Sequence, residues 1–248
     1  KVRVLRLREE DRFLPDLDAL RNLVTAKTKL IALSNPNNPT GALIDAAGLK
    51  AIAAIAAKAG AYVLCDEVYR GLDEQGSGFT ASIADLYDRG ISTGSMSKTY
   101  GLAGLRLGWI VAPKDFIHAV TVHRDYNTIS VGMLDDHFAA LALEHREALL
   151  RRNQGIARGN RKALDAWVAG ESKITYVKPS SGTIALLKPE TRMTSREFCI
   201  RLLEETGVLF TPGSALDMEG YLRIGYANNP EILRAGLDKF SGFLAKLN

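Results

Sequence analysis

The sequence predicts an α/β protein whose mostly parallel sheet is flanked by helices and followed by a smaller α+β unit. Through the first half, short apolar runs alternate with segments of helical period, which is typical of repeated βα units. From about Asp135, long helical patterns come first and short strands follow. With 46% hydrophobic residues, the 248-residue chain can bury a substantial core. We expect a large domain over residues 1–148 and a small C-terminal domain over residues 149–248.

Apolar runs mark the expected strands of the first half. Residues 2–7 carry four aliphatic side chains and predict a first strand. Residues 35–41 contain two prolines, three asparagines and a glycine, which predicts a loop. An alanine-rich helix follows, with Asp45 as its N-cap and Gly60 at its end. Further strands are expected over residues 30–33, 62–65, 91–93 and 107–112.

Helical patterns open the second half. Residues 134–144 and 146–168 predict one long helix or a broken pair. Pro230 begins a closing helix that is expected to end at Leu247. The remaining elements are an amphipathic helix over residues 195–206 and strands over residues 174–177, 183–187 and 208–210.

Three polar residues follow predicted strands. Asn38, Asp66 and Lys98 each come just after an apolar run. In open α/β sheets, ligands bind beyond the carboxyl ends of the strands. The pattern therefore places these three side chains on one rim of the sheet.

Composition argues against several classes of protein. A net charge of +4 without a long basic block argues against nucleic-acid binding, and no apolar stretch reaches the roughly 18 residues of a membrane span. The two cysteines, Cys65 and Cys199, lie in apolar segments and indicate neither a disulfide framework nor a zinc site. The histidines show no metal-ligand spacing. A reducing, cytoplasmic location is expected.

The most informative stretch is GSMSKTYGLAGLRLGW. In it Lys98 follows Ser95 and Ser97, and Arg106 stands eight residues after the lysine. This pattern indicates a lysine that holds an aldehyde cofactor beside a cationic clamp for a phosphate. NPNNPTG lies upstream, and the apolar run YVLCDEVY with its acid lies between the two. In this order, the three segments resemble the fold-type I pyridoxal-phosphate enzymes, specifically the class I/II aminotransferase family.

The resemblance covers essentially the whole chain and implies a role for each motif residue. Lys98 is the Schiff-base lysine, Asp66 is the partner of the pyridine nitrogen, and Tyr69 joins them as a catalytic residue. The other implied contacts are Asn38 and Tyr69 with the ring oxygen, Ser95, Ser97 and Arg106 with the phosphate, and Arg223 of YLRIGYA, together with Asn38, with the substrate.

These residue types suit that chemistry. A carboxylate at Asp66 stabilises a protonated ring nitrogen and raises its pKa, which helps the ring to withdraw electrons. The released amine of Lys98 can act as a general acid and base at the substrate Cα. Guanidinium groups suit phosphates and carboxylates because they donate bidentately.

The resemblance implies transfer of an amino group between an L-amino acid and a 2-oxo acid, by a homodimer that uses pyridoxal 5'-phosphate. The family's glycine-rich phosphate turn and ring-stacking aromatic have no match here, so we expect the large domain to lack its N-terminal part. Loops over residues 73–80 and 123–131 are expected to influence the choice of amino acid.

Other functions remain open on the same motifs. A lyase, decarboxylase, cyclase or amino-acid oxidase could use the same scaffold, and a relative that binds without catalysis is a further alternative. A P-loop is excluded because Ser97 and Ser92 stand where that motif requires glycines. A nicotinamide-binding domain is excluded because no G-x-G-x-x-G follows the first strand.

Overall fold

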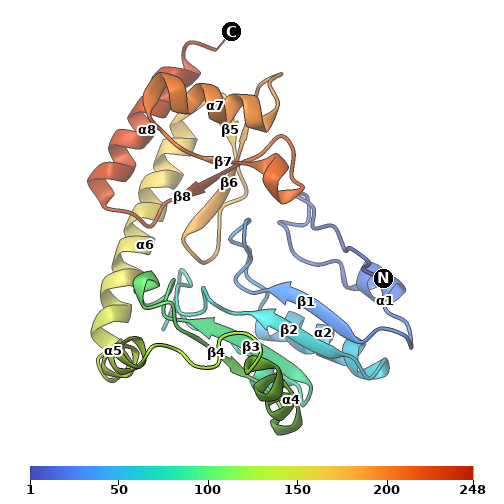
Figure 1. Cartoon of the computed structure of the whole chain (residues 1–248). Coiled ribbons are helices and arrows are strands. Elements are labelled where there is room, and N and C mark those ends of the chain that lie inside the picture. The colour runs from blue at the N-terminus through green and yellow to red at the C-terminus, as the bar shows by residue number, and fades with distance from the viewer. Residues whose placement is uncertain (248) are drawn as a thin grey trace.

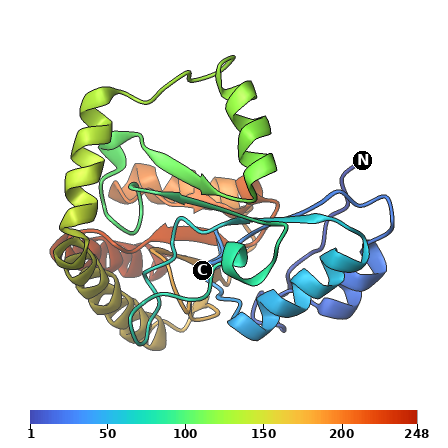
Figure 2. The ribbon, with the colours of Figure 1, turned by 90° about the horizontal axis from the view of Figure 1, so that it is seen from below.

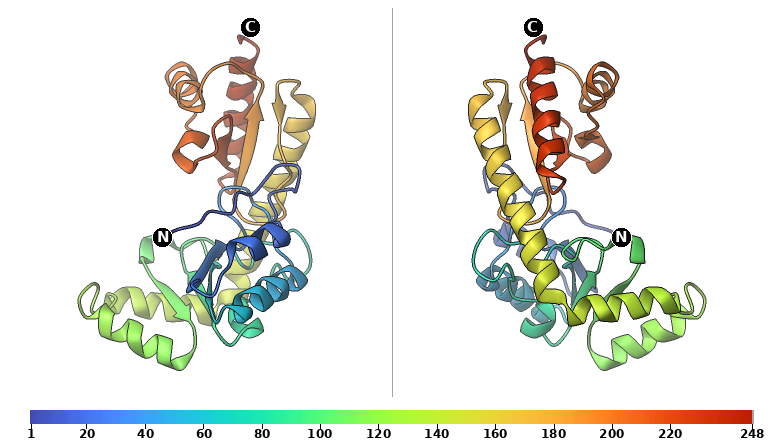
Figure 3. Two further views of the ribbon diagram at one scale, coloured as in Figure 1. Left: turned by 90° about the vertical axis from the view of Figure 1, so that its right-hand side faces the viewer. Right: turned by 90° about the vertical axis from the view of Figure 1, so that its left-hand side faces the viewer.

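The structure is a computed structural model that describes residues 1–247. Its strands form two four-stranded sheets, each with its own hydrophobic core. The long helix α6 (Arg146–Gly170) runs beside both sheets and joins them (Figure 1). Figure 3 shows from two opposite sides that α6 extends from the first sheet to the second. The first and second halves of the chain are thus connected by one continuous helix.

The first sheet is mostly parallel, as predicted. It contains, in spatial order, β1 (Leu30–Ser34), β2 (Tyr62–Asp66), β3 (Gly90–Ser95) and β4 (Gly108–Val111). The first three strands are parallel and β4 is antiparallel to β3. Ser34 lies opposite Asp66, which lies opposite Thr93. The carboxyl ends of the three parallel strands are therefore level at one edge.

Helices cover both faces of this sheet. Helix α2 (Ala46–Lys58) begins where predicted, because the Asp45 carboxylate accepts the Gly48 N–H at 2.7 Å, and it buries Leu49 and Ile52 in the core. The other helices of this half are α1 (Leu17–Leu23), α3 (Ile83–Leu86), α4 (Lys114–Arg124) and α5 (Met133–Glu144). Figure 2 shows α1 and α2 on one side of the sheet and α4 and α5 on the other.

The second sheet is antiparallel and smaller. Its order is β5 (Ile174–Thr175), β6 (Ile184–Pro189), β8 (Leu222–Gly225) and β7 (Thr211–Pro212). Helices α7 (Ser195–Thr206) and α8 (Pro230–Leu244) pack on it. Phe198 of α7, Phe240 of α8 and Leu164 of α6 are each fully buried in its core. This half is the α+β unit that the sequence predicts.

Two expected strands are absent from the described part of the chain. Residues 2–7 form no strand, because their backbone makes no hydrogen bond to another strand within residues 1–247. An apolar groove of about 1050 Å³ separates this segment from β1, and it is lined by Val2, Val4 and Leu30 among others. Residues 208–210 are also not a strand, since pairing with β8 begins only at Thr211.

The remaining helical predictions differ in detail. The long pattern of the second half is a broken pair, with α5 and α6 separated at His145. Helices α1, α3 and α4 are additions to the predicted elements. Among residues 1–247, no helix combines the length and the apolar character that a bilayer crossing requires.

Candidate active site

Three polar residues from three different segments meet the carboxyl edge of the first sheet. Asn38 belongs to the loop after β1, Asp66 is the last residue of β2, and Lys98 comes three residues after β3. Because β1, β2 and β3 are parallel and in register, these positions lie at the same rim. The predicted rim is confirmed.

The loop after β1 is stiffened by its own asparagines. Asn35 is 1% exposed, and its amide accepts the Ile44 N–H at 2.8 Å and donates to the Ile44 carbonyl at 2.9 Å. Asn37 donates to the Ser34 hydroxyl at 3.0 Å and accepts the Thr40 hydroxyl at 2.7 Å. These two side chains are used inside the loop, whereas Asn38 reaches across to another element.

Arg223 on β8 is the partner of Asn38. Its Nη1 donates to Asn38 Oδ1 at 3.1 Å, and its Nη2 donates to Thr211 Oγ1 at 3.2 Å. Thr211 begins β7, the strand next to β8, so the second sheet itself holds the guanidinium. A guanidinium has five N–H donors, so these two bonds leave others for a ligand.

Asp66 and Tyr69 occupy the turn that follows β2. The exposed Asp66 carboxylate accepts the Val68 N–H at 3.2 Å and the Thr93 hydroxyl at 3.3 Å. Tyr69 is 5% exposed, and burial raises the pKa of its hydroxyl above the ordinary value of 10.0, while a hydrogen bond from Thr183 opposes that rise. The Tyr69 hydroxyl therefore remains protonated, and a donor, at neutral pH.

Lys98 lies beside this turn. Its Nζ is 5.9 Å from the centre of the Tyr69 ring, and within residues 1–247 it forms no hydrogen bond or ion pair. The loop that carries it is fixed by its backbone, since Met96 is fully buried and accepts the Leu102 N–H at 2.9 Å. An amine on a fixed loop, without a partner of its own, is suited to reaction with a ligand.

Thr99 is a site residue that the sequence analysis missed. It is 2% exposed, and its hydroxyl lies 3.1 Å from the Val68 carbonyl and 2.8 Å from that of Arg70. This contact ties the Lys98 loop to the Tyr69 turn. The only signal in the sequence is its place next to Lys98, and Thr211 offers no signal at all.

The predicted phosphate contacts belong to the Lys98 loop and its ends, with Ser95 at the end of β3 and Arg106 shortly before β4. Ser95 Oγ accepts the Ser97 N–H at 3.0 Å, and Ser95 pairs with Gly108 across β3 and β4. Arg106 lies two residues before Gly108, and its backbone has a left-handed conformation with φ 49°. Its guanidinium donates to the Ala103 carbonyl at 2.9 Å and contacts none of the other predicted site residues. The structure therefore places Ser95 and Arg106 near each other through the strand pairing, without joining their side chains.

Comparison with known proteins places these features in context. The family model described as aminotransferase class I and II matches residues 1–240. Capreomycidine synthase of Streptomyces vinaceus is 35% identical over 95% of this chain and 60% of its own length. Aspartate aminotransferase of Pyrococcus abyssi is 31% identical over 95% of this chain and 62% of its own length.

Solved structures share the same arrangement. A PLP-dependent aminotransferase from Streptococcus suis superposes with a TM-score of 0.96 at 40% identity, covering 100% of this chain and 66% of that one. Aspartate aminotransferase of Thermotoga maritima superposes with a TM-score of 0.88 at 26% identity, covering 99% of this chain and 64% of that one. The chain thus spans roughly two thirds or less of the length of these proteins.

Proposed function

The chain belongs to the aminotransferase class I and II family, and on that premise we propose that it is a pyridoxal-phosphate-dependent aminotransferase. It moves an amino group between an L-amino acid and a 2-oxo acid. The observation that carries this proposal is the Lys98 amine, which has no partner within residues 1–247 and lies 5.9 Å from the centre of the Tyr69 ring. The carboxylate of Asp66 ends the strand that leads to this turn.

The donors and acceptors at the rim fit pyridoxal phosphate. An aldehyde requires an accessible amine, and Lys98 is exposed and unpaired in the described structure. A ring nitrogen requires an acidic partner, and Asp66 is exposed with only a hydroxyl and a backbone N–H on its carboxylate. When bound, this cofactor supplies an electron sink for the substrate Cα.

Asp66 and Tyr69 would act on opposite edges of the ring. The Asp66 carboxylate would keep a proton on the ring nitrogen by stabilising the positive charge there. The Tyr69 hydroxyl would donate a hydrogen bond to the ring oxygen, because burial raises its pKa and it stays protonated at neutral pH. The Asn38 amide would supply a second contact at that oxygen while its Oδ1 accepts from Arg223.

Lys98 and Arg223 would act on the substrate. Arg223 grips the α-carboxylate and so determines which face of Cα meets the Lys98 amine. Lys98 Nζ then takes the proton from Cα as a general base. Thr99 keeps the amine in reach, because its hydroxyl fixes the lysine loop against the Tyr69 turn.

Ser95, Ser97 and Arg106 would hold the phosphate. Two hydroxyls and one guanidinium provide neutral and charged donors for its oxygens. Arg106 must exchange its bond to the Ala103 carbonyl for the phosphate, and that bond is local and exposed.

The experiment that tests this function is a peptide map after incubation with pyridoxal phosphate and reduction with borohydride. The expected result is a phosphopyridoxyl group confined to Lys98, with the Lys98→Arg variant unlabelled. Label scattered over surface lysines, or no label, would contradict the proposal.

A cyclase, one of the alternatives open to the same scaffold, is the second candidate, because a relative of 35% identity is named a synthase rather than an aminotransferase. Both reactions require a proton to leave the substrate Cα, so the motif residues do not separate them. Product analysis separates them: a transaminase consumes a 2-oxo acid in equal amount to the amino acid, whereas a cyclase requires none.

We also propose that the protein works as a homodimer. Exposed apolar side chains gather on α4, α5 and the segment between them, at Val122, Tyr126, Met133, Leu134 and Phe138. An apolar face of this kind marks an interaction surface. Light scattering is expected to give a particle of twice the mass of the chain. Leu134→Lys is expected to lower that measured mass towards the mass of a single chain.

A further inference from the structure

Arg161 of α6 is a buried cation outside the site described above. Its side chain is 2% exposed, and its Nη2 lies 3.0 Å from Glu74 Oε1 in the loop after the Tyr69 turn. Neither Nε nor Nη2 makes a hydrogen bond of good geometry in the described structure. Burial of a guanidinium is costly, and a buried ion pair is a weak source of stability. The pair therefore calls for a role other than stability.

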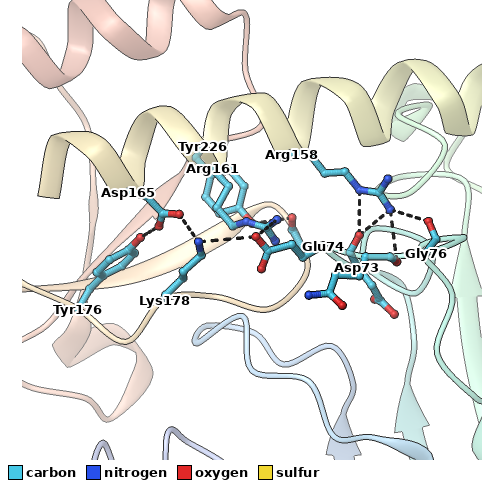
Figure 4. A network of polar contacts seen from close by, with 11 residues as sticks. Asp73, Glu74, Gly76, Arg158, Arg161, Asp165, Tyr176, Lys178 and Tyr226 are labelled. Carbon is cyan, nitrogen blue, oxygen red and sulfur yellow. Dashed lines mark hydrogen bonds and ion pairs between the residues drawn. The ribbon is translucent and has the colours of Figure 1, made fainter. Parts of the chain in front are cut away.

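The pair is part of a network that joins both halves of the molecule (Figure 4). Lys178, from the segment between β5 and β6, approaches Glu74 Oε1 to 3.6 Å and also pairs with Asp165 of α6. Asp165 in turn accepts the Tyr176 hydroxyl. Two cations and two carboxylates from three segments thus balance one another.

One face of α6 holds the loop that contains Glu74. Gln154, Arg158 and Arg161 are spaced four and three residues apart, so they lie on the same side of the helix. Gln154 donates to the Gly71 carbonyl at 2.8 Å, and Arg158 donates to the carbonyls of Asp73 at 2.9 Å and Gly76 at 3.1 Å. Of these three side chains, Arg161 is the one that meets a carboxylate of the loop.

The loop is continuous with the Tyr69 turn. Leu72 donates its N–H to the Tyr69 carbonyl at 3.2 Å, and both side chains share a buried cluster with Ala157 of α6 and Ile184 of β6. Glu74 follows two residues later. A shift of this loop relative to α6 would therefore move Tyr69.

The same loop also contacts the half of the molecule that carries Arg223. The Glu74 N–H donates to the Ser180 carbonyl at 3.1 Å, and the Ser181 hydroxyl donates to the Asp73 carboxylate at 2.8 Å. The chain then enters β6, where Leu186 lies opposite Arg223 of β8. The loop is thus fixed at once to the Tyr69 turn and to the strand next to Arg223.

We propose that Arg161 and Glu74 are positioning residues, whose ion pair holds the Tyr69 hydroxyl at a fixed place relative to Arg223. This role rests on the proposed function, in which Tyr69 meets the cofactor and Arg223 meets the substrate. Loss of the pair loosens the loop and moves the Tyr69 hydroxyl from the ring oxygen.

Arg161→Met is the variant that tests this role, because it leaves Glu74 partly exposed and still paired with Lys178. Arg161→Lys retains the charge without the planar fork and serves as the conservative variant. The matched control is Arg201→Met, which breaks the exposed pair of Arg201 with Glu205 on α7.

The measurement is the pH at which the absorbance of bound pyridoxal phosphate changes, together with the borohydride label at Lys98. When the cofactor's ring oxygen lacks the hydrogen bond from Tyr69, that oxygen carries more negative charge. The added charge stabilises a neighbouring proton on the cofactor and so raises the pKa at which this proton is lost. Loss of a hydrogen bond to a charged group corresponds to about one pKa unit. We expect the pH of the absorbance change to rise by this amount in Arg161→Met, to rise less in Arg161→Lys and to stay unchanged in Arg201→Met.

The variant Tyr69→Phe separates positioning from a general loss of order. Adding Arg161→Met to Tyr69→Phe is expected to give no further shift, because the affected hydroxyl is already absent. The proposal would be overturned if the absorbance of Arg161→Met changed at the same pH as that of the wild type. It would also be overturned if the double variant showed a further shift beyond that of Tyr69→Phe. If Arg161→Met does not fold, the Arg161→Lys titration decides in the same way. An unlabelled wild-type protein would instead overturn the proposed function, and this role with it.

Discussion

Arg223 and Asn38 are 185 residues apart in the sequence, and their side chains are joined by a hydrogen bond of 3.1 Å. The bond links the second sheet to the loop at the rim of the first. Arg223 is therefore oriented by two elements, since Thr211 holds its other nitrogen at 3.2 Å. A guanidinium fixed in this way loses little freedom when it binds a carboxylate.

Arg223→Lys is expected to weaken substrate binding while it leaves the cofactor label at Lys98 intact. An ammonium cannot reproduce the bidentate contact, and a charge-assisted hydrogen bond contributes about 1.5–3 kcal/mol. The KM for the amino acid should rise roughly 10- to 100-fold in steady-state kinetics. The control is Arg234→Lys on the exposed face of α8, and equal KM values in the two variants would refute the role of Arg223.

Gly41→Ala is expected to destabilise the protein more than Gly60→Ala. Both glycines have a left-handed backbone, with φ of 70° and 63°, which costs alanine about 1–2 kcal/mol. A Cβ at Gly41 would lie 2.4 Å from Pro179 Cβ, whereas one at Gly60 would meet nothing within 4 Å. The clash adds about 1–3 kcal/mol. Urea unfolding measures the difference, and equal midpoints for the two variants would count against the close packing of the loop on Pro179.

In Tyr226→Phe, the free energy of unfolding is expected to fall less steeply with rising pH in the alkaline range than in the wild type. Tyr226 is fully buried, and burial raises the pKa of its hydroxyl above the ordinary value of 10.0. Above that value the unfolded chain releases the proton while the folded chain keeps it. The stabilising contribution is therefore complete below about pH 10 and is lost as the pH rises, by up to about 1.4 kcal/mol per pH unit.

The measurement is the free energy of unfolding in urea at pH values from about 8 to 11.5. The variant also loses the hydroxyl bond to the Gly182 carbonyl, 2.7 Å long, which should cost about 1 kcal/mol at neutral pH. Its stability should then fall less steeply than that of the wild type above pH 10. Parallel curves would show that Tyr226 does not titrate abnormally.

Local patterns predicted most of the fold and the motif residues of the rim. Strands β1 to β3 are predictable because apolar runs of strand length end at turn residues. Helix α2 is predictable because Asp45 caps an alanine-rich segment. Because the three parallel strands end at one level, the residues that follow them lie at the same edge of the sheet. The position of the rim could therefore be predicted from local sequence patterns.

Contacts between distant segments were not predictable in the same way. Thr99 and the pair of Arg161 with Glu74 depend on how α6 lies against the Tyr69 turn, and no spacing in the sequence encodes that. Residues 2–7 have the composition of a strand, yet a strand exists only where a neighbour supplies hydrogen bonds. Pattern alone cannot say whether that neighbour is present.

The groove beside β1 also has a consequence for the behaviour of the protein in solution. Within residues 1–247, one edge of β1 has no pairing strand, and Leu30, Val2 and Val4 expose their aliphatic side chains beside it. Such an edge can pair with the same edge of another molecule, which joins two molecules through β1. Together with the proposed dimer face on α4 and α5, this second contact can link dimers into longer assemblies. Concentrated solutions of this polypeptide should therefore become turbid, and Leu30→Lys should keep them clear.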